Sequence, residues 1–432
     1  MVIFIYFLLL ALGLIAYKVK KYSSYIIISF LIISNGAGFL PEPLPIKVND
    51  VFLMLCIGTW FIKYRAFPLD DAGRYIKYLT IYYILSSLIT ILLGFENSQY
   101  ALMVLRLEIY ILAYFLFKML PFVSIEHSAR GIFLISLITG IFYYLQFLGI
   151  TGILQNGDKE VTGITTRLNN IPLCTDFIIY YLVYTSKKVH FKWFYLLFFI
   201  GMVLMSQNRG QWLAVGLCVS IILIYKRQAK KIIYGALFLT ITIYIFLPVI
   251  LYRFSEGGKT GSDLLTEISG CYNILVNGGS LYYSQGASVM YTEGTSMFRA
   301  LLIRERIDYM LNNPITIFCG IGSIHEMSSS AAKLPFMMGN LWENGNVKKI
   351  DTNDLAFFSH FVRYGLIYIV LFFKFLVVSL KQLLRNHKSE LFFCCFMLLL
   401  DSLIQTFNGD RFSGVNMMFI PLLLISQAFK QD

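Results

Sequence analysis

The chain has 432 residues, of which 57% are hydrophobic and only 14% charged, and its mean hydropathy is +0.68. This composition excludes a soluble globular protein, because the polar side chains are too few for a water-exposed surface. Repeated apolar runs of membrane length also exclude the short alternating strands of a β-barrel. The sequence therefore predicts an all-α polytopic membrane protein with about 12 to 14 transmembrane helices.

The net charge of +12 follows the order of the apolar runs. More than half of the Lys and Arg residues lie in short tracts between these runs, at 18–21, 63–77, 118–130, 187–192, 226–231, 381–388 and 430. By the positive-inside rule, these tracts mark the cytoplasmic loops. The rest of the chain carries slightly more acidic than basic residues, so the charge pattern does not predict a nucleic-acid partner.

In chain order, the predicted transmembrane helices are 2–17, 24–40, 49–62, 78–95, 100–117, 131–150, 171–185, 193–206, 211–225, 232–251, 360–380, 391–407 and 414–429. The basic tracts place the N-terminus outside. We therefore divide the chain into helices within 1–251, a large extracytoplasmic loop at 252–359 that is too polar for lipid, and C-terminal helices within 360–432.

Two helices are predicted inside the large loop. The stretch 262–271 has the pattern of a short helix. A second helix is expected from Ser296 to Leu311, with Ser296 as its cap and Pro314 ending it. The loop thus has structure of its own.

The remaining features of the loop are a polar stretch, a turn and two cysteines. Gly, Ser and Tyr dominate 276–288, which predicts a mobile surface segment. A G-x-G sequence that begins at Gly320 predicts a tight turn. The spacing of Cys271 and Cys319 does not decide whether they form a disulfide.

Arginines recur at the predicted outer ends of helices, where Lys and Arg are otherwise scarce. The candidates are Arg167, Arg209, Arg299, Arg304 and Arg306. A guanidinium group binds phosphate oxygens through two parallel hydrogen bonds, so a lipid-linked phosphate or pyrophosphate is the predicted partner. The alternative for each arginine is a neighbouring acid or an extended side chain at the membrane surface. Helical geometry places Arg299 and Arg306 on one face and Arg304 on another.

Three residues near the outer face are candidate general bases: His325, His360 and Asp354. A histidine accepts a proton near neutral pH, and a carboxylate can accept one or orient a histidine. The alternatives are structural roles for both histidines and helix capping by Asp354. Neither histidine has metal-ligand spacing, so we predict no metal and no cofactor.

Four charged residues lie within or beside predicted spans: Arg106, Glu108, Asp176 and Asp401. Charge inside a membrane is costly, so each needs a partner. A structural pair and a proton path both remain open for them.

Four stretches together resemble the O-antigen polymerase and O-antigen ligase superfamily of bacterial inner-membrane glycan enzymes, the Wzy-type polymerases in particular. They are TTRLNNIPLCTDFII from position 165, LMSQNRGQWLAVGL from 204, FRALLIRERIDYMLNNPITIFCGIGS from 298 and DTNDLAFFSHFVRYGLIYI from 351. Their order around a large outer loop carries the resemblance. The first five predicted spans match the family only in being hydrophobic.

The resemblance implies an inverting glycosyltransferase at the outer (periplasmic) face of the bacterial cytoplasmic membrane. Its donor would be an undecaprenyl-pyrophosphate-linked oligosaccharide repeat unit, used without nucleotide sugar or metal, and its product a longer glycan. The resemblance also implies a further partner for the protein, a chain-length regulator in the same membrane. The alternatives are a ligase that moves glycan to the lipid A core and a transporter of lipid or polysaccharide without chemistry.

The resemblance also implies roles for individual residues. Arg167, Arg209 and Arg299 match family arginines and are expected to hold the pyrophosphate. Ligases have His-Asn at the start of the fourth motif, where this chain has Asn353 and Asp354 after a threonine. This departure favours a polymerase and leaves Asp354, or one of the two outer histidines, as the base.

Overall fold

The computed structural model describes residues 2–43, 46–63, 69–150, 152–155, 159–162, 165–168, 171–206, 208–227, 264–277, 295–339, 347–350, 355, 357–407, 412 and 414–430. These residues are almost entirely helical, with one two-stranded antiparallel hairpin. The expected helical class is confirmed, and the hairpin is an addition that the sequence did not predict.

The N-terminal helices are α1 (Val2–Lys18), α2 (Tyr22–Ile33), α3 (Val48–Ile62), α4 (Asp71–Leu92), α5 (Ser98–Glu108), the 3₁₀ turn η1 (Ile109–Leu112), α6 (Ala113–Lys118) and α7 (Phe122–Phe147). The hairpin β1 (Lys159–Thr162) and β2 (Thr165–Leu168) precedes α8 (Thr175–Tyr184), α9 (Lys192–Met205) and α10 (Arg209–Tyr225).

The large loop contributes α12 (Leu264–Asn277), α14 (Thr295–Asn312), α15 (Pro314–Cys319) and α16 (Ser329–Lys333), and the chain ends with α17 (Phe358–Arg385), α18 (Glu390–Ile404), the turn η3 (Gln405–Phe407) and α19 (Val415–Ala428). Every predicted span except 232–251, which lies outside the described residues, overlaps at least one of these helices, and 100–117 runs across α5, η1 and α6. Within the described residues, four helical stretches are long and apolar enough to cross a membrane: Asp71–Leu92 (α4), Ser98–Lys118 (α5, η1 and α6 together), Phe122–Phe147 (α7) and Phe358–Arg385 (α17).

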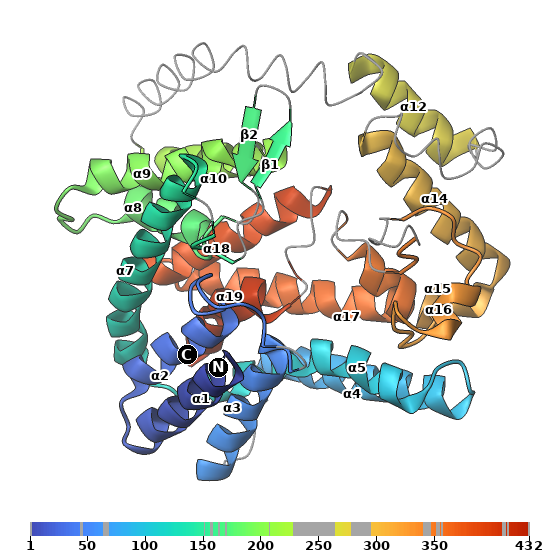
Figure 1. Ribbon diagram of the computed structural model, residues 1–432, viewed down its shortest axis with the longest axis horizontal. Coiled ribbons are helices and arrows are strands. Elements are labelled where there is room, and N and C mark those ends of the chain that lie inside the picture. The colour runs from blue at the N-terminus through green and yellow to red at the C-terminus, as the bar shows by residue number, and fades with distance from the viewer. Residues whose placement is uncertain are drawn as a thin grey trace.

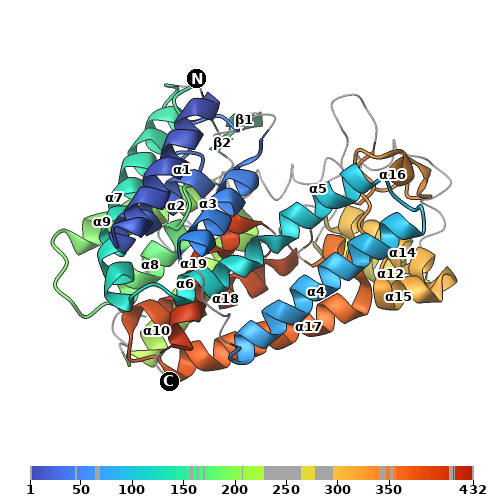
Figure 2. The same cartoon turned by 90° about the horizontal axis from the view of Figure 1, so that it is seen from below.

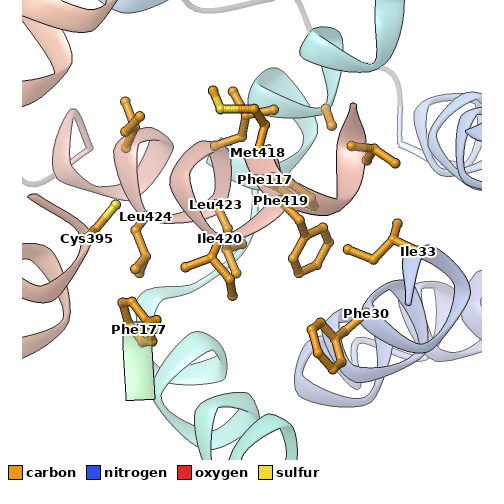
Figure 3. Packing of buried hydrophobic residues seen from close by; sticks show 14 of the residues in the cluster. Phe30, Ile33, Phe117, Phe177, Cys395, Met418, Phe419, Ile420, Leu423 and Leu424 are labelled. Carbon is orange, nitrogen blue, oxygen red and sulfur yellow. The ribbon is translucent and has the colours of Figure 1, made fainter. Parts of the chain in front are cut away.

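The helix α19 lies at the centre of the main bundle, and its side chains meet those of α2, α6, α8 and α18 (Figure 3). Phe419 of α19 contacts two other helices: its ring centroid is 5.2 Å from that of Phe117 in α6 and 6.3 Å from that of Phe30 in α2. Outward-facing apolar side chains such as Phe4 and Phe61 are 71% and 73% exposed. Interior packing and an apolar exterior together are typical of a helical membrane protein.

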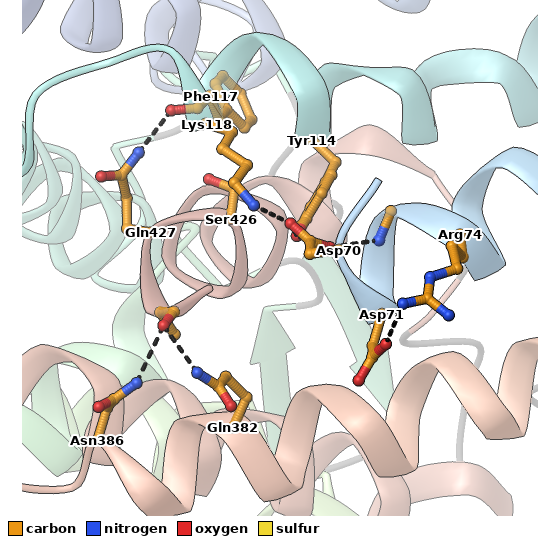
Figure 4. Close-up of polar contacts among 12 residues, drawn as sticks. Asp70, Asp71, Arg74, Tyr114, Phe117, Lys118, Gln382, Asn386, Ser426 and Gln427 are labelled. Carbon is orange, nitrogen blue, oxygen red and sulfur yellow. Dashed lines mark hydrogen bonds and ion pairs between the residues drawn. The ribbon is translucent and has the colours of Figure 1, made fainter. Parts of the chain in front are cut away.

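Residues of three predicted cytoplasmic tracts lie near one another around the end of α19 (Figure 4). Asp70 caps α4 by accepting a 2.7 Å hydrogen bond from the Gly73 amide, and it also pairs with Lys118 of α6. Gln382 and Asn386, near the end of α17, both donate to the Ala428 carbonyl of α19 at 3.0 Å. A common side of the membrane requires such clustering. The identity of the membrane and the orientation within it stay predictions.

The helices α4, α5 and α17 extend away from the bundle and carry α12, α14, α15 and α16 at their far end (Figures 1 and 2). The predicted loop helices are confirmed as α12 and α14. Helix α14 begins at Thr295, so Ser296 lies inside it and not at its cap, and Pro314 begins α15. Residues 278–288 of the Gly- and Tyr-rich stretch lie outside the described residues. Cys271 and Cys319 do not form a disulfide with each other in this structure.

Candidate functional site

The G-x-G turn of the third motif binds the backbone of the fourth. The amide of Ile321 donates to the Val362 carbonyl and that of Gly322 to the Arg363 carbonyl, each at 2.9 Å. These bonds form just before Gly365, where α17 departs from helical geometry (φ 68°, ψ −165°). The two motifs therefore form one structural unit, although they are separate in the sequence.

Only glycine fits at two positions of this unit. A Cβ atom on Gly320 would lie 2.1 Å from the Arg363 carbonyl oxygen, and one on Gly365 would lie 2.3 Å from the Phe318 carbonyl oxygen. Both glycines also have positive φ and ψ near 180°, a conformation essentially restricted to glycine. The absence of side chains lets the two backbones approach each other closely.

Helix α4 supports the same unit from the other side. The Tyr82 hydroxyl donates a 2.6 Å hydrogen bond to the Tyr364 carbonyl, which lies directly before the break in α17. The hydroxyls of Ser87 and Ser323 are 2.8 Å apart, and the Ser323 amide donates to Thr90 Oγ1 at 3.0 Å. Three polar side chains of a membrane-length helix thus hold the turn and the kink.

The structure pairs His360 with Glu108. His360 Nε2 lies 3.2 Å from Glu108 Oε2, and both side chains are buried. Glu108 ends α5, where regular helix gives way to the 3₁₀ turn η1, and His360 lies shortly before the kink of α17. The imidazole also stacks on Tyr368 with 5.2 Å between ring centroids. These contacts fix the orientation of the ring.

His325 lies elsewhere, beside the connection between α4 and α5. Its amide donates to Glu96 Oε2 at 3.2 Å, its Nδ1 accepts from the Met327 amide at 3.2 Å, and its ring stacks on Tyr100. Its role as a base stays a prediction. Asp354, the third candidate base, lies outside the described residues.

Arg306 organises the interior of the loop. Its side chain is fully buried, and its guanidinium bonds Glu305 Oε2 at 2.6 Å, the Lys349 carbonyl at 2.8 Å and the Met338 carbonyl. Burial raises the pKa of Glu305, whereas the neighbouring Arg306 and the amides that bond its carboxylate act in the opposite direction. In this conformation Arg306 faces protein groups, and phosphate would have to displace them.

Arg304 also has protein partners. Its Nε donates to Asp308 Oδ2 at 2.9 Å, one turn further along α14, and another guanidinium nitrogen donates to the Leu275 carbonyl of α12 at 2.8 Å. Arg304 therefore pairs with a neighbouring acid, which was the alternative to phosphate binding. Its side chain keeps 27% exposure.

The three arginines expected to hold pyrophosphate are not brought together. Arg299 is half-buried on α14. Arg167 lies in β2 opposite Glu160 of β1, and Arg209 is the first residue of α10; the side chains of both lie outside the described part of the chain. The hairpin and α10 lie apart from α14 in both views (Figures 1 and 2).

A polar pocket joins the first and second motifs. Gln211 of α10 donates to both carboxylate oxygens of Asp176 in α8, at 2.9 and 3.0 Å. Gln405 donates to Asp401 at 2.8 Å. Both aspartates line a cavity of about 70 Å³, together with Thr175. Two of the charges that the sequence placed in spans, those of Asp176 and Asp401, thus have side-chain amide partners. Arg209 is the first residue of the helix that supplies Gln211.

Some residues of the site carried no signal in the sequence. Glu108 was expected to need a partner, but 252 residues separate it from His360 and nothing in the chain links the two. Its neighbour Arg106 pairs instead with Asp50 at 3.0 Å. Among the described residues, no group of three or more His, Cys, Asp or Glu side chains is arranged to hold a metal ion.

We call the polar contacts that join α4, α5, α17 and the G-x-G turn the junction. The fold and this junction define an α-helical membrane protein with interrupted helices. The chain matches no protein-family model, no curated protein and no solved structure.

Proposed function

We propose that the protein polymerises oligosaccharide repeat units carried on undecaprenyl pyrophosphate, at the outer face of the cytoplasmic membrane. One observation carries the proposal: the four stretches that resemble such polymerases associate in pairs. The first and second meet through Asp176 and Gln211, and the third and fourth meet through the G-x-G turn and the kink of α17. Adjacency within each pair is what a common site would require of these segments.

In the proposed reaction, an acceptor sugar hydroxyl attacks the anomeric carbon of the donor. The bond from this carbon to the phosphate oxygen breaks, and its electron pair leaves with the pyrophosphate. Arginine side chains stabilise the developing negative charge. The hydroxyl proton passes to a base, and attack from the opposite face inverts the anomeric centre.

Of the three candidate bases, His360 has the contacts that suit the task best. If its Nε2 donates to Glu108, the neutral ring carries its lone pair on Nδ1, which can accept a proton. Glu108 then acts as a positioning residue for the imidazole. Asp354 and His325 stay candidates.

The arginine clamp requires a movement. Because α14 lies apart from the hairpin and α10, Arg299 meets Arg167 and Arg209 on one pyrophosphate only after the loop approaches the bundle. Charge attraction to the donor supplies the differential binding that such a closure needs.

The test is elongation of lipid-linked repeat units by purified protein in detergent. We expect Arg209→Ala and Arg299→Ala to abolish elongation while both variants purify normally. Arg74→Ala is the matched control, because this exposed arginine pairs with Asp71 at the basic end of the molecule. Near-normal product length in both site variants would refute the clamp. Failure of the unaltered protein to elongate any such unit would refute the enzyme, and transfer of finished glycan to a lipid core would identify a ligase.

A further inference from the structure

The segment 311–324 is an uncharged part of the large loop that packs against α4 and α17. Its sequence, LNNPITIFCGIGSI, contains no charged residue. It forms the end of α14, then α15 and the G-x-G turn, and its side chains Leu311, Ile315 and Phe318 are 59%, 79% and 56% exposed. Large apolar side chains exposed together are unexpected in a loop surrounded by water.

Contacts with α4 give the depth of this segment. The Tyr82 hydroxyl lies 3.5 Å from the Cys319 carbonyl and 2.6 Å from the Tyr364 carbonyl. Tyr82 precedes the far end of α4, Leu92, by ten residues, which at 1.5 Å per residue is about 15 Å. That distance is about half the thickness of the hydrocarbon core of a bilayer. The turn at Gly320 therefore reaches the level of the middle of a membrane-length helix.

The chain then returns along the same helix. Ser323 contacts Ser87 and Thr90, and the His325 amide bonds Glu96 beyond the end of α4. The contacts on α4 thus move toward its far end as the chain proceeds from 319 to 325. This order describes a hairpin-like excursion that goes in and comes out on the same side.

The apolar surface of α15 adjoins a surface that lipid is expected to cover. At the level of the turn and beyond it, α4 exposes Ile81, Ile84, Leu85, Leu88 and Ile89, each by 40 to 54%. Helix α15 packs against the start of α17, which itself packs along α4. Lipid chains that cover the exposed face of α4 would therefore also reach α15.

The backbone of the turn is suited to such a place. Non-helical backbone at membrane depth is tolerated only where its polar groups are satisfied by protein. The amides from 320 to 324 all donate to protein oxygens: Gly320 to Thr316, Ile321 to Val362, Gly322 to Arg363, Ser323 to Thr90 and Ile324 to Gly322. The segment can thus leave water without orphaned amide groups.

We propose that residues 311–324 form a re-entrant membrane segment, with Ile315 and Phe318 in contact with lipid acyl chains. Helix α15 enters from the outer side, the turn at Gly320 lies near the middle of the bilayer, and 321–324 returns along α4. The part of the loop that bears the G-x-G motif is then inside the membrane, and the extracytoplasmic loop is shorter than the sequence suggested. This inference does not depend on the proposed enzymatic activity.

The experiment measures the depth of nitroxide spin labels in reconstituted vesicles. Labels are attached at Ile315→Cys, at Leu85→Cys of α4 and at Met327→Cys, in a background where Cys174, Cys271 and Cys319 are serine. Met327 is 66% exposed and lies after the turn, so it serves as the water-exposed reference. We expect the label at 315 to collide with oxygen more than with a water-soluble nickel chelate, as at 85. A nickel accessibility at 315 equal to that at 327 would overturn the proposal.

The native Cys319 gives a second measurement without any change at the site. A charged reagent does not enter the hydrocarbon core of the bilayer, so a charged maleimide should modify Cys319 at least about tenfold more slowly than Met327→Cys in the same vesicles. In both proteins Cys174 and Cys271 are replaced by serine. The first protein keeps Cys319, and the second carries Met327→Cys with Cys319 also replaced by serine. Equal rates would contradict immersion of the segment in lipid.

Discussion

Replacing Gly320 by alanine adds a methyl group where the structure leaves no space. The new Cβ would lie 2.1 Å from the carbonyl oxygen and 2.2 Å from the carbonyl carbon of Arg363, and backbone atoms cannot rotate away as a side chain can. The residue also has φ 72° and ψ −171°, which alanine adopts only with strain. The turn must therefore separate from α17.

The expected cost has two parts. Backbone strain in this region of φ and ψ contributes about 1 to 3 kcal/mol. Separation breaks the bonds from Ile321 to Val362 and from Gly322 to Arg363, each worth about 1 kcal/mol net. Together these terms lower the free energy of unfolding by about 3 to 5 kcal/mol, a large fraction of the stability of a typical protein.

Thermal melting of the detergent-purified protein measures the effect, with the monodisperse fraction as the readout. The matched control is Gly94→Ala: φ there is also positive, at 68°, but no atom lies within 4 Å of the added Cβ. Its cost should be the strain alone, about 1 to 2 kcal/mol. Gly216→Ala, within α10 and facing open space, should not destabilise the protein. If Gly320→Ala and Gly94→Ala melt at the same temperature, close packing of the turn on α17 is not what requires glycine.

Two further predictions concern buried charges. Because burial raises the pKa of Glu305, the folded protein keeps a proton that the unfolded chain has already lost once the pH rises above the ordinary value of 4.5, so stability should fall with rising pH between the two pKa values. Glu305→Gln should flatten the melting temperature over that window, and an unchanged slope would contradict the assignment. In the elongation assay, His360→Gln and Glu108→Gln should each lower the rate by about 10²-fold or more, the usual worth of a general base. The double variant should lose little more than His360→Gln alone, whereas multiplied losses would show that the two residues act separately.

Much of the helical framework could be predicted because its signal is local. Apolar runs located most of the described helices, a helical pattern located α12, and cap and stop residues located α14 within the loop. The hairpin at 159–168 was missed, although the β-branched residues on both sides of Gly163 gave a weak signal for it.

The contacts that form the junction could not be predicted, because they join segments distant in the chain. The bond between Tyr82 and Tyr364 spans 282 residues, and that between Ser87 and Ser323 spans 236. The glycine inside the fourth motif was seen only as part of a helix. Its positive φ becomes understandable once the turn at Gly320 is packed against it. The absence of charge in 311–324 is compatible with the proposed re-entrant segment, but residues 268–292 are also uncharged, so only the contacts with α4 and α17 single this segment out.

The two interrupted helices have a common explanation in the proposed chemistry. A break in a helix at membrane depth leaves backbone groups without their regular partners, and it persists only where other groups satisfy them, as Tyr82 does for the Tyr364 carbonyl. Regular helices would avoid this cost, yet both α5 and α17 are interrupted near the Glu108 and His360 pair. A base must be held at a fixed position, whereas Arg299 must move toward Arg167 and Arg209 before the three arginines can bind one pyrophosphate. Substitutions at the junction should therefore lower stability and rate together, and substitution of Arg299 should lower the rate alone.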